Sequence, residues 1–326
     1  MLPARIQVWS LLCLAVVAGC GPHRAGEARA KPASRDLGRA VSGRLADVLE
    51  RSDREGTVPI GCEIVASLDF SSQVGASALR SLQGRLLRAA PSELMGGMAA
   101  LGIDAFHDFR KALLCKIAAR GLADQDMGVA VSGAFPSDLL AKAASGKNTF
   151  HSDVVDGIPV LADQRLWIAQ RGKGEVVFCT SARLLRGFLT GPVEGFDVGR
   201  DTAFFLRMSG ASLRAVLAGR RGFQAPEFAP VQRLAIDLTG DGMMLTASAL
   251  TPDGPAAEKL ARAMNDAVGE WRRHTTEAGR AEPEIAVRVG GTEVVVRARL
   301  PPGAIESALS SALGAMASNS AILRSR

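Results

Sequence analysis

The sequence contains no tyrosine, and aromatic residues make up only 5% of its 326 residues. Sites that bind single-stranded nucleic acid stack bases on aromatic rings, so few residues of this chain suit that role. Histidine occurs four times, and no two cysteines have the CxxC spacing of zinc or dithiol redox sites. The catalytic patterns HExxH and GxSxG are also absent. We therefore expect neither a cofactor nor a metal, and no motif identifies an enzyme.

A large excess of one charge sign is missing as well. The 39 basic and 33 acidic residues give a formal net charge of +6, spread along the chain. A nucleic-acid-binding face needs basic residues gathered on one side of a domain. We therefore expect no nucleic acid as a partner.

The N-terminal apolar run is too short to cross a bilayer. It extends from Ile6 to Gly19, and Arg5 is the only charge before it. A spanning helix needs about 20 residues, whereas a shorter run that ends in small residues is typical of a cleaved signal. An ordinary secretory signal is one interpretation.

The run ends in Val17-Ala18-Gly19-Cys20, which resembles the lipobox of bacterial lipoprotein precursors. The resemblance implies cleavage before Cys20 and acylation of its thiol, which would anchor the chain to a membrane. Gly21 after the cysteine favours the outer over the inner membrane, and leaves open which face of it. With its order of elements, the chain resembles uncharacterised envelope lipoproteins of GC-rich Gram-negative bacteria. We accordingly divide the N-terminal region into a signal peptide (1–19) and a flexible tether (20–56) that includes an amphipathic helix over 36–52.

Of the five cysteines, Cys13 lies in the leader and Cys20 is the expected acylation site, which leaves Cys62, Cys115 and Cys179. Cys62 and Cys115 fall on the apolar faces of two expected strands. A disulfide between them requires Cα atoms within about 7 Å. Two buried free thiols are the alternative.

The remaining chain predicts two strand–helix–hairpin modules. Alternating apolar residues predict strands over 58–70, 111–119 and 127–135, with a weaker strand over 154–161 that Asp156-Gly157 interrupts. A hairpin around Arg171–Gly174 and a helix over 181–190 complete the first module (57–195). The second module (196–326) has a strand over 202–208, a helix over 210–220, a helix ending at Gly279, and hairpins over 234–249 and 285–300. The similarity of 75–85 to 210–220 suggests a duplication. We expect an α+β fold in which helices cover one face of antiparallel sheets.

Few side chains suggest a reactive site. Asp104, His107 and Asp108 share one helix face but are more simply surface residues, and Asp69 more simply caps a helix. Our leading hypothesis is therefore a non-catalytic envelope lipoprotein that binds a protein partner or has a structural role. One alternative is a carrier of lipid or another apolar ligand. Another is an enzyme with an unrecognised acidic site that brings Asp69 near His107 or His151.

Overall fold

The computed structural model describes residues 57–73, 75–76, 105–117, 126–136, 138–145, 150–162, 166–172, 174–195, 201–218, 226–239, 241, 243–277 and 284–299. The leader, Cys20, the tether and its helix lie outside these residues. The chain divides into two compact units, with the boundaries falling within the strand that contains Val65 and between Asp197 and Val198. Of the described residues, unit 2 contains 57–65 and 105–195, and unit 1 contains 66–76 and 201–299.

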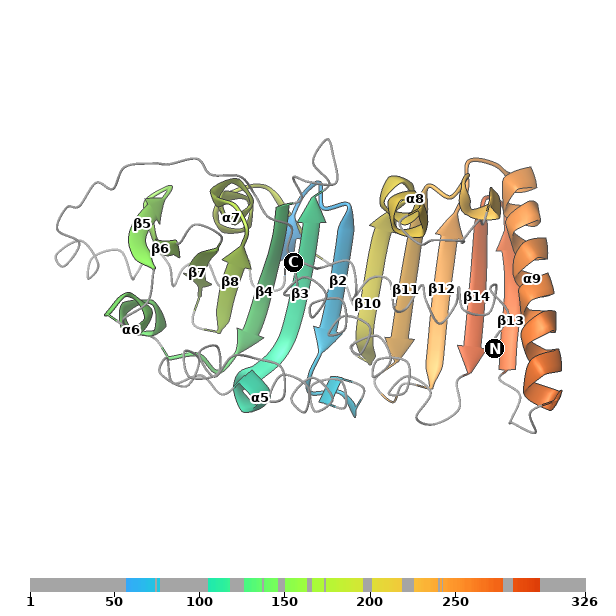
Figure 1. Ribbon diagram of the computed structural model, residues 1–326, viewed down its shortest axis with the longest axis horizontal. Helices are drawn as coiled ribbons and strands as arrows, with labels where there is room; N and C mark the ends of the chain where they lie inside the picture. Colours follow the sequence, from blue (N-terminus) through green and yellow to red (C-terminus); the bar gives the residue numbers. More distant parts are fainter. Residues whose placement is uncertain are drawn as a thin grey trace, which may run out of the picture. The chain divides into compact units, whose positions relative to one another are not determined.

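Unit 2 is built mainly from short antiparallel strands (Figure 1). Its elements are β1 (Thr57–Pro59), the start of β2 (Ile64–Asp69), α5 (Ala105–Asp108), β3 (Phe109–Ile117), β4 (Asp126–Gly133), α6 (Leu139–Ser145), β5 (His151–Val155), β6 (Ile158–Ala162), β7 (Trp167–Arg171), β8 (Glu175–Cys179), α7 (Ala182–Leu189) and β9 (Val193–Gly195). The strands lie in the order β2-β3-β4-β8-β7-β6-β5, and β1 pairs separately with β9.

Unit 1 follows with fewer and longer elements. They are β10 (Thr202–Ser209), α8 (Gly210–Ala218), the 3-10 turn η2 (Pro226–Phe228), β11 (Arg233–Thr239), β12 (Met244–Leu250), α9 (Gly254–Glu277), β13 (Glu284–Gly290) and β14 (Glu293–Arg299). In β11, β12 and β14 every second side chain is buried, as the period-two apolar pattern predicts. The apolar stripe of α9 is buried too, and the helix contacts β13 and β14.

The two units repeat one strand order. In unit 1 the order is β10-β11-β12-β14-β13, which corresponds to β2-β3-β4-β8-β7. In both, a hairpin follows the first strand, and the last strand of a second hairpin pairs with the end of the first hairpin. Unit 2 differs by the additional hairpin β5–β6. This shared topology supports the duplication suggested by the sequence.

The expected α+β class is wrong, because the described part of the chain is mostly β. Antiparallel strands make up most of each unit, and β1 and β9 form a separate two-stranded sheet. The described helices α5 to α8 have only four to nine residues, and α9 alone is long. More of the described residues lie in hairpin strands than in helices, and helices of four to nine residues are too short to cover the sheet of either unit.

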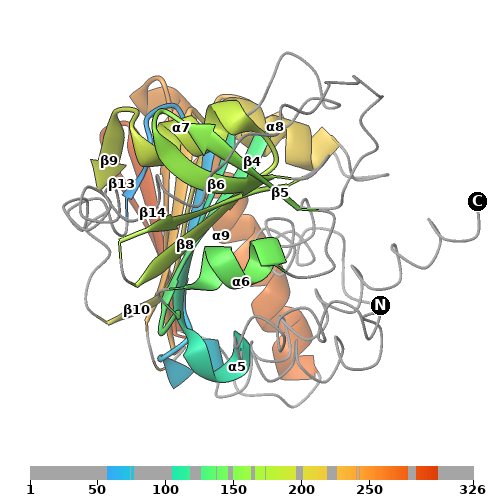
Figure 2. The ribbon, with the colours of Figure 1, turned by 90° about the vertical axis from the view of Figure 1, so that its left-hand side faces the viewer.

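Helices of unit 2 also lie on both faces of its strands, not on one (Figure 2). Neighbouring residues of β8 show this, because Val177 belongs to the apolar cluster under α7 and Val176 to the cluster under α6. Ala169 and Ile168 of β7 divide in the same way. Since successive side chains of a strand point to opposite faces, this unit has two cores.

Two of the expected strands are each divided in two. The strand over 58–70 breaks where Gly61 adopts a φ of +95°. On one side of the break β1 pairs with β9, and on the other side β2 lies next to β3. The strand over 154–161 is the hairpin β5–β6, whose turn is made by Asp156 (φ +48°) and Gly157 (φ +81°). Positive φ at both central residues is the type I′ turn geometry that Asp-Gly favours.

Candidate functional site: a buried ion-pair network and a disulfide beside β1

The most extensively built polar site in the described residues lies beside β1. This three-residue strand pairs with β9, and the side chain of its middle residue, Val58, is completely buried. Pro59 packs close to Gly187 of α7, where a Cβ atom would lie 3.1 Å from the proline ring. The short strand is thus held between β9 and α7.

An ion pair of Arg171 and Glu175 is buried next to β1. The two residues face each other across the β7–β8 hairpin, immediately before and after its turn, and each side chain is 1% exposed. Nε and Nη2 of Arg171 both bind Oε2 of Glu175. The other carboxylate oxygen accepts a hydrogen bond from Ser132 Oγ at 3.2 Å. The hairpin turn therefore brings two opposite charges into the core as a pair.

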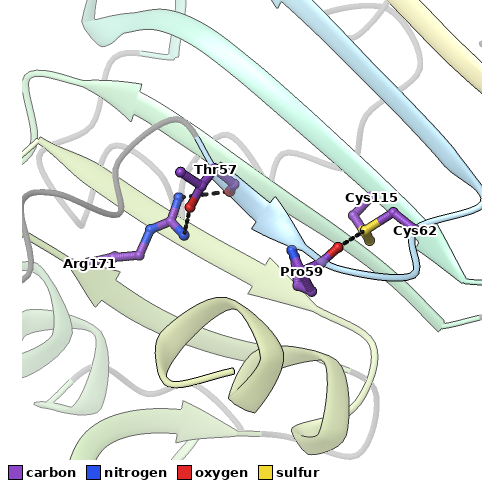
Figure 3. Close-up of a disulfide and its surroundings, with 5 residues drawn as sticks. All are labelled: Thr57, Pro59, Cys62, Cys115 and Arg171. Atoms are coloured by element: carbon purple, nitrogen blue, oxygen red, sulfur yellow. Dashed lines mark hydrogen bonds between the residues drawn. A yellow bond between two sulfur atoms is a disulfide. The ribbon is translucent and has the colours of Figure 1, made fainter. Parts of the chain in front are cut away.

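The guanidinium also binds Thr57 of β1 (Figure 3) and the Phe188 carbonyl of α7. Its Nη2 donates to the Thr57 carbonyl at 3.2 Å, and Nη1 donates to Thr57 Oγ1 at 3.5 Å. Nη1 further donates to the Phe188 carbonyl at 3.3 Å, and the guanidinium lies 5.6 Å from the centre of the Phe188 ring. The N–H groups of Arg171 thus contact four acceptor atoms on three elements, in keeping with the hydrogen bonding that a buried charge requires.

Cys62 and Cys115 are joined by a disulfide, with Cα atoms 5.4 Å apart (Figure 3). The bond connects the segment that follows β1 to β3. Its sulfur on Cys62 lies 2.9 Å from the Pro59 carbonyl oxygen. Because a disulfide sulfur carries no hydrogen, this contact becomes a hydrogen bond only in the reduced thiol form. Closing a loop between residues 53 apart contributes about 4 kcal/mol to stability in the chain-entropy model.

The third cysteine, Cys179, is a buried free thiol. Cys115, Gly128 and Cys179 occupy one row across β3, β4 and β8, so Cys179 lies two strands, or about 10 Å, from Cys115. That separation is too long for a disulfide. Burial, with a smaller effect of Asp126, raises the pKa of the Cys179 thiol well above its usual value, and Arg171 opposes the rise only weakly. Cys179 is therefore an inert core residue.

Three other candidates from the sequence, Asp69, His107 and His151, lie among the described residues. The Asp69 carboxylate accepts hydrogen bonds from the backbone and hydroxyl of Ser71 at 2.8 and 2.6 Å. His107 is exposed with Nδ1 3.4 Å from Asp108, while Asp104 lies outside the described residues. His151 is exposed on β5. Within the ranges that the structure describes, no three His, Cys, Asp or Glu residues gather as metal ligands.

The sequence predicts the Arg171–Gly174 turn but does not reveal the buried ion pair beside it. Opposite charges on the two residues that flank a hairpin turn are a signal for such a pair, because these residues face each other across the two strands. Such pairs are normally solvent-exposed, however. Only the packing of β1 and α7 against the hairpin buries this one.

No protein-family model matches this sequence, and no curated protein does either. Among solved structures, crystal form III of TP0453 is similar in fold, with a TM-score of 0.50 and 11% sequence identity over 78% of this chain and 96% of that chain. Crystal form IV of the same protein aligns with a TM-score of 0.47 and 10% identity over 79% of this chain and 98% of that one. At this identity the likeness shows the fold alone. In the part of the chain described here, no helix is both long and apolar enough to cross a membrane.

Proposed function

We propose that this chain is a lipid-anchored envelope protein with a non-catalytic binding or structural role, held to the outer membrane through Cys20. The observation that carries the proposal is the Val17-Ala18-Gly19-Cys20 sequence at the end of a 14-residue apolar run. Acyl chains contribute about 0.8 kcal/mol per buried CH₂, so a multiply acylated cysteine holds a protein to a bilayer without a spanning helix.

The chemistry of unit 2 supports a non-catalytic role. Its most buried polar groups, Arg171 and Glu175, bind each other and nearby protein groups, so their charges serve the fold. The thiol of Cys179 has a raised pKa and is inaccessible, which is the opposite of a nucleophilic cysteine. The role proposed is therefore one that a stable β-rich domain performs by presenting a surface.

Replacement of Cys20 tests the anchor, and Cys13 provides a matched control within the same leader. Wild-type protein and Cys13→Ala should fractionate with membranes, and their intact mass should correspond to a chain that begins at Cys20 and carries acyl groups. Cys20→Ala should carry no acyl mass and move to the soluble fraction. Acyl-free wild-type protein, or membrane retention of Cys20→Ala equal to that of the wild type, would contradict the proposal.

A carrier of an apolar ligand is the second candidate, and one observation favours it. The cluster under α6 has four buried members, Leu139, Leu161, Ile168 and Val176, but six partly exposed apolar neighbours: Phe109, Phe135, Leu140, Phe150, Leu166 and Phe178. Partly exposed aromatic side chains beside a short helix offer a surface for an acyl chain.

Titration with a fluorescent fatty acid tests this second function. Saturable binding should weaken at least tenfold in Phe135→Gln, whose ring lies 5.9 Å from that of Phe109. The control Met244→Gln changes an exposed apolar residue of unit 1 and should bind normally. Absence of saturable binding to the wild type would exclude the carrier role for this ligand class.

A further inference from the structure

The segment Thr57–Cys62, called the strap below, follows the predicted tether and is the first described segment of unit 2. We propose that the Arg171 network and the Cys62–Cys115 disulfide hold the strap jointly against the rest of unit 2. The membrane-facing end of the unit is then fully fastened only in the oxidised protein. Naming the membrane rests on the proposed function, whereas the fastening itself does not.

The ion-pair network depends on the strap for part of its bonding. Arg171 donates to two oxygens of Thr57, namely its carbonyl and its hydroxyl oxygen. If β1 departed, the buried guanidinium would lose both without gaining equivalent partners. Leaving a buried charge incompletely bonded is costly, so the network favours the docked strap.

The repeated strand order provides an internal comparison. In unit 1 the hairpin equivalent to β7–β8 is β13–β14, where the pair next to the turn is Gly290 and Glu293 in place of Arg171 and Glu175. Gly290 and Glu293 are both exposed. A hairpin of this kind thus forms without the arginine, which indicates that Arg171 serves the strap and α7 more than the hairpin.

The disulfide fastens the other end of the strap. Between the two fastenings, Ile60 N donates to the Pro192 carbonyl at 3.1 Å, and beyond them Glu63 N donates to the Lys116 carbonyl at 2.9 Å. The bond forms when the Cys62 and Cys115 thiols release two protons and two electrons to a protein or small-molecule disulfide, which becomes a dithiol. Exported compartments supply such oxidants, so export would complete the fastening.

Hydrogen exchange measured by mass spectrometry on the full chain tests the joint action. The readout is the exchange of the amides of residue 58 and residues 60–63, and of 193–195 in the paired strand β9. Arg171→Met/Glu175→Leu removes both charges together, and Cys62→Ala/Cys115→Ala removes the covalent bond. Each should speed exchange in both segments at least tenfold, and the combined variant should leave them unprotected.

Asp156→Asn is the matched control. It weakens a different polar fastening of unit 2, in which Asp156 accepts hydrogen bonds from Arg186 Nε at 3.1 Å and Thr190 Oγ1 at 2.7 Å. Strap exchange should stay at the wild-type rate in this variant. Arg171→Lys, which keeps the charge but has fewer donors, replaces the double variant if the latter does not fold.

Unchanged strap exchange in either the ion-pair variant or the disulfide variant would overturn the proposal. Equal acceleration throughout β3 and β4 would also overturn it, because the effect would then be global unfolding. The same measurement on Cys20→Ala should match the wild type. Failure of lipidation therefore leaves the result for the strap interpretable.

Discussion

The buried pair of Arg171 and Glu175 permits the sharpest quantitative test of these structural arguments. Replacing Arg171 by Met removes the guanidinium that binds Oε2 of Glu175 and keeps the Ser132 hydroxyl that donates to Oε1. The carboxylate stays buried at 1% exposure without its countercharge. Removing one partner of a buried ion pair typically costs about 3–5 kcal/mol of folding stability.

Removing both charges should cost less than removing one. In Arg171→Met/Glu175→Leu no isolated charge remains, and apolar replacement of a buried pair is often nearly neutral. The Ser132 hydroxyl and the Thr57 and Phe188 carbonyls lose partners, at about 1 kcal/mol each or less. We therefore expect a loss of about 1–3 kcal/mol for the double variant, which is about 2 kcal/mol less than for Arg171→Met alone.

Urea unfolding followed by far-UV circular dichroism measures these values, and Glu175→Leu completes the double-mutant cycle. A single Arg171 variant that loses less than about 1 kcal/mol would show that the pair is not buried as described. Additive effects of the two single substitutions would also contradict a stabilising ion pair, since they would mean that the two charges do not interact.

Three further predictions follow from individual core and sheet positions. Gly128→Ala should lower the free energy of unfolding by about 1–3 kcal/mol, because the added Cβ would lie 2.5 Å from the Phe188 ring and 2.9 Å from Cys179 Sγ. An unfolding midpoint in urea equal to that of the wild type would contradict this packing. Cys179 should resist iodoacetamide up to pH 9 and react after unfolding, since burial raises its pKa; labelling of the native protein within minutes would show an open core. Burial also raises the pKa of Asp237, so its folded-state pKa exceeds the unfolded one and the charged group lowers stability at neutral pH. Asp237→Asn should therefore raise the Tm at pH 7, with a difference that disappears as the pH falls below about 4; a difference that grows on acidification would reverse the assignment.

Much of the order of elements follows from local sequence. The hairpin predicted around Arg171–Gly174 is confirmed as β7–β8, and the hairpin around Asp241 as β11–β12. Ser181 caps α7, where its hydroxyl accepts from the Leu184 amide at 3.2 Å. Turns, caps and period-two alternation depend on neighbouring residues, so they can be read without tertiary information.

The predictions that were wrong concern features that depend on contacts between segments far apart in the sequence. The alternation over 58–70 continues through Gly61, but Thr57–Pro59 pairs instead with β9, more than 130 residues away. The fold class was wrong because a sequence shows which residues are apolar, not how many strands join one sheet. Pairing between strands is set by contacts that no local pattern contains.

The amino-acid sequence alone specifies the short apolar run from Ile6 to Gly19, the apolar faces of the strands and the three candidates for disulfide pairing, Cys62, Cys115 and Cys179. Tertiary structure alone decided that Cys62 meets Cys115, that Cys179 lies out of reach, and that Arg171 and Glu175 are buried. The physical reason is the same in each case. Spacing along the chain fixes which way a side chain points, whereas burial and pairing depend on what packs against it.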